Sequence, residues 1–251
     1  MRAHLIHGDG TPLQAWNASQ HLSLVPTIDC ERLVPPEARA VIVAPHPDDE
    51  VLGCGGLLQL LFQLGRQVLL ISVTDGSASH PGSPYWTAHR LGIVRPQESA
   101  EALHRLGIPV AELKWLRGGF PDAGVGRHLG ELKRFLATYL QPSDVVFTTW
   151  REDGHADHEA VGLATLEVGS EIGALVHEVP IWAWHWASPE DPRIPWERAR
   201  KVELDIWTLA RKRHAVQAFA SQLYADPGGG PPVLGSASLE RLQQPFELFF
   251  L

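Results

Sequence analysis

The sequence is poor in cysteine and has neither a long apolar run nor an excess of positive charge. Its two cysteines among 251 residues, Cys30 and Cys54, exclude a disulfide-rich framework and allow at most one disulfide. We expect both thiols to be reduced and the protein to be cytoplasmic. The first ten residues are too polar for a signal peptide, and no apolar run has the length of a membrane span.

The charge of the chain is acidic. There are 29 Asp and Glu residues against 21 Lys and Arg, which gives a formal net charge of -8. This sign argues against nucleic acid and anionic membranes as main partners, and it leaves open a small neutral substrate. The hydrophobic content of 44% is ordinary for a globular enzyme. The composition does not fix the oligomeric state.

Two common signatures are also missing. No His-Glu-x-x-His helix is present, which disfavours a zinc metalloprotease. Gly53-x-Gly55 follows an apolar run, as a dinucleotide fingerprint would, but Leu58 stands where the third glycine should be. The acidic residues ahead of these glycines would also repel a pyrophosphate. A nucleotide- or carbohydrate-binding module without catalysis is therefore only an alternative hypothesis.

The sequence does contain apolar runs that alternate with helical patterns. This alternation is typical of an α/β fold, with a mostly parallel sheet and helices on both faces in three layers. Residues 1–38, which carry four prolines and little periodicity, are interpreted as an N-terminal extension. Extended segments are predicted at 40–43, 67–73, 112–116, 144–148 and 175–186, helices at 50–64, 95–106, 128–140, 156–169 and 196–222, and a last apolar piece at 246–251.

The first chemical motif directly follows the apolar run 40–43. Residues 46–50 read His-Pro-Asp-Asp-Glu. Three consecutive acidic side chains repel one another unless a cation or a reaction needs them. Taken alone, they also suit a solvated turn or the N-terminus of a helix, where the helix dipole favours negative charge.

The second motif follows the predicted strand 144–148, where residues 155–158 read His-Ala-Asp-His. In open α/β sheets the site lies at the carboxyl ends of the strands, so both motifs are expected to meet there. Imidazole and carboxylate are zinc ligands, and a catalytic zinc keeps three protein ligands and one position for water. Asp48 and Asp49 are adjacent, so one can bind metal while the other faces the water. His155 and His158 can divide ligation and oxyanion stabilisation between them.

Together the two motifs resemble those of the PIG-L/LmbE-like zinc deacetylases. The likeness covers roughly residues 40–222, and we expect a PIG-L/LmbE-like deacetylase domain over 39–251. The family's Rossmann-like fold agrees with the predicted alternation of elements. Further features similar to the family are the glycines around Cys54, Thr74-Asp75-Gly76, Arg95 with Glu98, and Ser221-Gln222. Ala156, where the family often has proline, and Phe219, where histidine or tyrosine is common, depart from its pattern.

The resemblance implies how the reaction would run. Zinc, or another divalent ion accepted by the same ligands, would be bound by His46, Asp49 and His158. Asp48 would be the general base that deprotonates the zinc-bound water. The expected reaction is hydrolysis of an amide bond, namely de-N-acetylation of an N-acetylated amino sugar or its glycoconjugate. An amidase acting on a non-sugar or thiol-conjugate amide is the alternative.

Two further residues of the second motif receive roles from the same resemblance. His155 would stabilise the tetrahedral oxyanion or protonate the leaving amine. Asp157 would orient or tune a neighbouring histidine, as carboxylates behind metal ligands do.

Substrate contacts are predicted for Arg95, Trp150 and Trp184. Trp182, Trp184 and Trp186 alternate, so in a strand they would share one face. That face would either pack on the extension or the long helix predicted at 196–222, or form an aromatic wall for a sugar ring or acyl chain. Trp150 directly precedes the second motif and is expected to line the pocket. Arg95 could bind a sugar hydroxyl or a carboxylate, or pair with an acidic residue of its own helix, Glu98 or Glu101.

Overall fold

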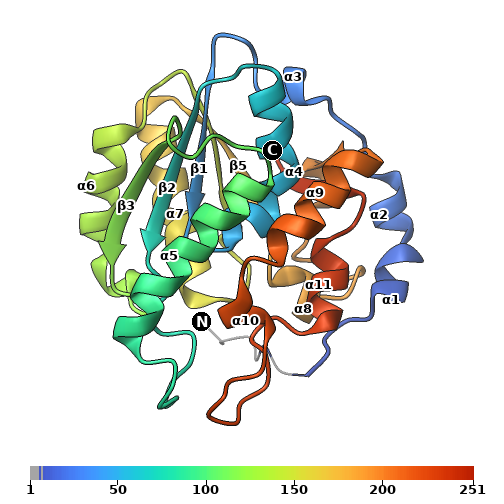
Figure 1. Ribbon diagram of the computed structural model, residues 1–251. Coiled ribbons are helices and arrows are strands. Elements are labelled where there is room, and N and C mark those ends of the chain that lie inside the picture. The colour runs from blue at the N-terminus through green and yellow to red at the C-terminus, as the bar shows by residue number, and fades with distance from the viewer. Residues whose placement is uncertain (1–5, 7) are drawn as a thin grey trace.

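The structure, a computed structural model, describes Ile6 and residues 8–251 (Figure 1). Within this part of the chain, one seven-stranded sheet has the order β3-β2-β1-β4-β5-β7-β6. The first five strands in this order are parallel, and β7 is antiparallel to both of its neighbours. The strands are β1 Arg39–Ala44, β2 Val68–Thr74, β3 Lys114–Phe120, β4 Asp144–Thr149, β5 Leu175–Val179, β6 Ala199–Glu203 and β7 Phe246–Phe250.

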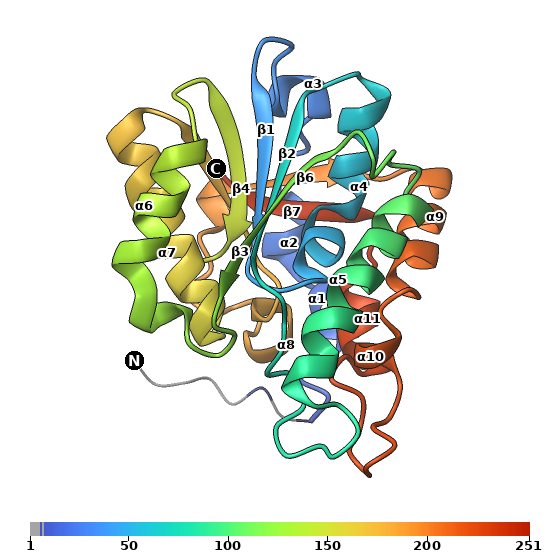
Figure 2. The ribbon, with the colours of Figure 1, turned by 60° about the vertical axis from the view of Figure 1, so that its left-hand side comes forward.

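Helices cover both faces of the sheet, as Figure 2 shows. Alternate residues of β1 enter two separate cores: Ile42 packs with Leu58 of α4, whereas Val41 packs with Leu132 of α6 and Val161 of α7. The prediction of a three-layer, Rossmann-like α/β fold is therefore confirmed. The main helices are α4 Asp49–Gln63, α5 Ala88–Arg105 and α9 Ile206–Val216 on one face, and α6 Leu129–Tyr139 and α7 Ala156–Ile172 on the other.

The helix expected over 196–222 is wrong. The segment forms a short 3-10 turn, Trp196–Arg198, then β6, α9 and the short helix α10 Ala220–Leu223. β6 is extended because it pairs with β7, for example Lys201 with Leu248, and sequence periodicity cannot show such a distant partner. Asp205 then begins α9, because its side chain accepts the backbone N–H groups of Trp207 and Thr208.

The extended segment expected over 175–186 is also partly wrong. β5 ends at Val179, and the three alternating tryptophans belong to a turn and the short helix α8, Ala183–Trp186. The cause is the carboxylate of Asp153, which accepts the backbone N–H groups of Ile181 and Ala183. These hydrogen bonds turn the chain at 181–183 and end its extended conformation. Consequently the tryptophans do not share one face of a strand.

The N-terminal segment packs on the rest of the molecule through α1 Leu13–Asn17, α2 Gln20–Leu24 and α3 Cys30–Leu33. Trp16 is buried against Trp184, with ring centroids 4.8 Å apart, and donates its indole N–H to the Trp184 carbonyl at 3.0 Å. Thr27 forms a parallel bridge with Lys201 of the edge strand β6. A domain boundary at residue 38 stays a prediction.

Both cysteines are buried free thiols, as expected, and burial raises the pKa of Cys30 to about 11. In the described part of the chain, no helix combines the length and the apolarity that crossing a bilayer requires.

A buried ion pair ties α4 to two distant elements. The Glu247 carboxylate of β7 accepts the backbone N–H groups of Gly56 and Leu57 at 2.7 and 2.8 Å. It also pairs with Lys212 Nζ of α9 at 2.6 Å, and both side chains are almost fully buried. Since α4 begins with the first chemical motif, this pair fixes the helix that carries the site.

Candidate metal and active site

The two chemical motifs meet because β1 and β4 are parallel neighbours. Ile42 of β1 pairs with Phe147 of β4, so the carboxyl ends of both strands lie at the same edge of the sheet. The loop after β1 leads into α4, and the loop after β4 leads into α7. This is the arrangement that the sequence predicted.

Three candidate ligand atoms form a nearly equilateral triangle. His46 Nδ1, Asp49 Oδ2 and His158 Nε2 lie 3.2 Å from one another. Donor atoms around a tetrahedral zinc, bonded at about 2.0–2.2 Å, lie about 3.3 Å apart. All three side chains are buried, so the triangle has the size and the surroundings of a metal site.

Two carboxylates hold the other nitrogen of His46. Its Nε2 lies 3.2 Å from Asp122 Oδ1 and 3.4 Å from Asp157 Oδ2. Asp157 is itself fixed, because it accepts the backbone N–H groups of Ala123 and Val125. A proton on Nε2 satisfies these acceptors and leaves the Nδ1 lone pair facing the triangle.

His158 is oriented in the same way by Asp153. Its Nδ1 lies 2.8 Å from Asp153 Oδ2. That carboxylate is fully buried and also accepts the N–H groups of Ile181, Trp182 and Ala183 at 2.9–3.0 Å. Asp153 therefore fixes the ring of His158 and the start of α8 together.

Asp48 points to a different partner from Asp49. Its Oδ2 accepts from Arg95 Nη2 at 2.9 Å, and the guanidinium also donates to the carbonyls of Pro47 and Gly76. Burial raises the pKa of Asp48 to about 6, against the opposing effect of Arg95. The two adjacent carboxylates thus point in different directions, Asp49 into the triangle and Asp48 toward Arg95.

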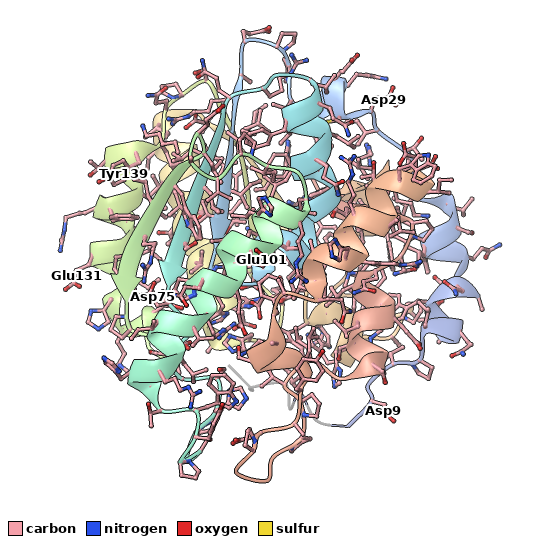
Figure 3. The ribbon with its side chains drawn as sticks, viewed as in Figure 1. Asp9, Asp29, Asp75, Glu101, Glu131 and Tyr139 are labelled. Carbon is pink, nitrogen blue, oxygen red and sulfur yellow. The ribbon has the colours of Figure 1, made fainter. Side chains whose placement is uncertain are left out.

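The ion pair with Glu98 or Glu101, one of the two alternatives considered for Arg95, does not form. Glu98 accepts from the backbone and hydroxyl of Ser221, and Glu101 pairs with Arg105 at 2.7 Å. Glu101 lies on the outer face of α5, at the front of Figure 3, whereas Arg95 is buried on the inner face. Arg95 therefore turns toward the site.

His155 lies beside the triangle and is half-buried. Its ring centroid is 4.9 Å from that of His46 and 4.8 Å from that of His158. Its Nδ1 accepts the backbone N–H of Asp157, which places the ring proton on Nε2. Burial, then the neighbouring His158 and His46, lowers the pKa of His155 to about 3. The ring is therefore neutral and can donate one hydrogen bond.

Other ligand sets overlap the triangle. Nitrogen atoms of His46, His155 and His158 lie within 4.8 Å of one another, as do ligand atoms of His46, Asp122 and Asp157. The residues could hold a metal ion in either set as well. The triangle combines two imidazoles with a carboxylate at a spacing of 3.2 Å. Among the described residues, its carboxylate, Asp49, accepts from one backbone group, the N–H of His46.

A cavity of about 460 Å³ opens beside these residues, a volume suited to a small-molecule ligand. Trp184 lines it, but Trp150, which was expected to line the pocket, does not. Trp150 directly follows β4 and is buried, with its ring against those of Trp186 and Phe250. The cavity's chemical end is lined by His46, Asp48, Asp49, Arg95, Asp122 and His155, and its apolar side by Leu52, Ile181, Trp182, Trp184, Leu234 and Leu242.

Sequence reasoning missed two carboxylates that hold the histidines. Asp122 lies two residues after the end of β3, a parallel strand, so the same rule that located the two motifs applies to it. The strand was expected to end at residue 116, and this hid the signal. Asp153 lies two residues before His155 in the same loop, but only the structure shows that its carboxylate turns inward.

Comparison with known proteins gives a consistent result. Residues 41–168, half of the chain, match the family PIG-L, described as GlcNAc-PI de-N-acetylase. The 1D-myo-inositol 2-acetamido-2-deoxy-alpha-D-glucopyranoside deacetylase of Segniliparus rotundus is 32% identical over 54% of this chain and 54% of its own length. A probable N-acetyl-alpha-D-glucosaminyl L-malate deacetylase of Bacillus cereus is 26% identical over 75% of this chain and 89% of its own. The chain thus spans only about half the length of the Segniliparus relative.

A solved structure is similar over most of the fold. The A40926 pseudoaglycone deacetylase superimposes with a TM-score of 0.59 at 26% identity, and the match covers 85% of this chain and 96% of that one.

Proposed function

The chain belongs to the PIG-L family of de-N-acetylases, and from this we propose that it hydrolyses the amide bond of an N-acetylated amino sugar, in particular a glucosamine conjugate. One observation carries the proposal: His46 Nδ1, Asp49 Oδ2 and His158 Nε2 lie 3.2 Å apart beside a cavity of small-molecule size. Both curated relatives described above are named as deacetylases of glucosamine conjugates, which supports the sugar class.

The triangle would hold a divalent ion, and its donor set fits zinc. Two imidazoles and one carboxylate, spaced for tetrahedral bonds, are a donor set of catalytic zinc sites. When bound, such an ion supplies Lewis-acid polarisation of the amide carbonyl and lowers the pKa of a coordinated water to about 7.

Asp48 is the proton acceptor in this proposal. It lines the cavity, it is not part of the triangle, and Arg95 holds it in place. A general base works best when its pKa is near the working pH, and burial raises the pKa of Asp48 toward that range.

His155 is the oxyanion donor in this proposal. Its Nδ1 is occupied by the Asp157 N–H, so Nε2–H is the group that can donate into the cavity. A donor fixed before the reaction stabilises the developing negative charge without reorganisation. Asp157 then serves His46 and His155 together, the first through its carboxylate and the second through its backbone.

The test is acetate release by metal-depleted and zinc-reloaded protein. The substrates are N-acetylglucosaminyl malate and N-acetylglucosaminyl inositol, and metal content is measured in parallel. We expect hydrolysis only in the reloaded protein, with about one ion per chain. Full activity after metal depletion would contradict the proposal, and so would release of acetate only from non-sugar amides.

A further inference from the structure

The apolar side of the cavity comes from outside the segment that matches the family. The matched segment ends at residue 168, yet α8 and the short helix α11, Ser236–Leu242, supply much of the wall opposite the chemical end of the cavity. Even Ile6 reaches the cavity. The wall residues from these regions are Trp182, Trp184, His185, Leu234, Arg241 and Leu242.

A loop of the N-terminal segment, residues 9–11, forms hydrogen bonds with α8 and the residue that follows it. Thr11 donates its N–H to the carbonyl of His185 at 2.8 Å and its hydroxyl to the carbonyl of Ala187 at 2.7 Å. Gly10 has a φ of +66°, and a Cβ there would lie 2.5 Å from the His185 oxygen and 2.7 Å from the His185 ring. The contact is therefore too close for any other residue at position 10.

Arg241 joins this loop to the cavity wall. Its side chain is 2% exposed, and Nη1 donates to the carbonyls of Asp9 and Thr11 at 2.7 and 2.9 Å. Its Nη2 lies 3.0 Å from Nδ1 of His185 and 3.3 Å from Ser238 Oγ. Among the described residues, no carboxylate lies within ion-pair distance of this guanidinium.

These contacts make Arg241 a connector between three segments. Asp9, labelled in Figure 3, has an exposed side chain, so the loop is held by its backbone carbonyls and not by its acid. Four neutral acceptors hold this buried cation, whose Nε has no partner among the described residues. Loss of one acceptor would leave a further buried donor unpaired, which is costly. A shift of residues 9–11 must therefore move α8 or α11.

We propose that the loop 9–11 is a specificity-determining part of the site, which through Arg241 and α8 sets the wall that receives the group attached to the amino sugar. The inference rests on the proposed function. Because Trp182, Trp184 and Leu242 form this wall, it fits an apolar or aromatic group, and aromatic faces also suit a sugar ring. Hydrolysis of substrates with such a group depends on the loop, whereas hydrolysis of free N-acetylglucosamine depends mainly on the residues of the triangle and the chemical end of the cavity.

Gly10 of the loop and Gly8, which directly precedes the loop, provide a matched pair of variants. Gly10→Ala forces His185 to move, whereas Gly8→Ala carries a similar backbone strain at φ +69° and meets none of the described residues within 4 Å. The two substrates are N-acetylglucosamine and its phenyl β-glycoside, with amine release and zinc content as readouts. We expect Gly10→Ala to lower kcat/KM for the glycoside about tenfold more than for the free sugar, with zinc retained. We expect Gly8→Ala to keep both values within about twofold of wild type.

The outcomes separate the two proposals. Wild-type protein that hydrolyses neither of these substrates nor the malate and inositol conjugates contradicts the proposed function, and the glycine pair is then compared by calorimetric binding of the phenyl glycoside. An active enzyme in which the two variants behave alike, or in which Gly10→Ala slows both substrates equally, overturns the inference. Equal dissociation constants for the two variants overturn it in the binding experiment.

Arg241→Met keeps the test decisive if Gly10→Ala does not fold. It removes the four hydrogen bonds and retains most of the side-chain volume. Folding is checked by circular dichroism and melting temperature. We expect the same loss of selectivity for the phenyl glycoside, and a folded variant with the wild-type substrate ratio would count against the role of the loop.

Discussion

The two sides of the cavity are built in different ways. The chemical side comes from residues 46–49 and 153–158, which parallel strands place at one edge of the sheet. The apolar side comes from α8, α11 and the N-terminal loop, which are joined by side chains and carbonyls. Sheet geometry thus fixes the reactive groups, while segments far apart in the chain fix the shape around them. Variants on the chemical side should therefore affect metal binding and turnover, whereas variants on the apolar side should affect substrate selectivity and stability.

The largest effect is expected from a variant in the triangle. His158→Ala removes one of the three candidate ligand atoms, so the protein should lose both bound metal and amide hydrolysis. Metal content by mass spectrometry and acetate release measure the two losses. His104→Ala, at an exposed position, is the control and should keep both. A variant that still binds a full equivalent of metal would exclude His158 as a ligand.

Asp48→Asn should separate the chemistry from metal binding. The amide keeps the shape of the side chain and a hydrogen-bond acceptor for Arg95, but it cannot take a proton. We expect kcat to fall by about 10²–10⁴-fold with metal content unchanged. If metal and turnover disappear together, Asp48 is itself a ligand and the division between the two adjacent carboxylates is incorrect.

Asp153→Asn probes the residue where the two sides of the cavity meet. The carboxylate holds His158 and three N–H groups at the start of α8, and the amide offers a single acceptor in its place. We expect metal affinity to fall about 10–100-fold, measured by competition with a chelator. Unchanged affinity would mean that the ring of His158 does not depend on Asp153.

The smallest effect on catalysis is expected on the apolar side. Trp16→Phe removes the indole N–H that satisfies the buried carbonyl of Trp184. The free energy of unfolding should fall by about 1–3 kcal/mol, measured by denaturant titration. Metal affinity should remain at the wild-type value, and a loss of metal in the folded variant would remove the distinction between the two sides.

The chemical side could be predicted from sequence because its signals are local. Each motif directly follows an apolar run that forms a parallel strand, and the two strands are neighbours. The resemblance to the family then gave individual roles to His46, Asp49 and the others, and these roles stay predictions until the variants are measured.

The apolar side could not be predicted because its causes are distant in sequence. The position of Trp184 depends on Asp153, which lies about thirty residues earlier and curls the start of α8. β6 is a strand because β7 pairs with it, and the periodicity of 196–222 does not contain that information. From sequence, Arg241 is an ordinary helical residue, and only the structure shows that it donates to the carbonyls of Asp9 and Thr11.

The position of β7 has a consequence for how the nascent protein folds. β7 is synthesised after β6 yet lies between β5 and β6, so β6 joins the sheet only when this later strand has inserted. Glu247 of the same strand supplies the acceptors for Gly56 and Leu57 in α4. A nascent chain that ends before β7 would therefore expose an open edge of the sheet at β5 and would lack the Glu247 acceptors that hold α4.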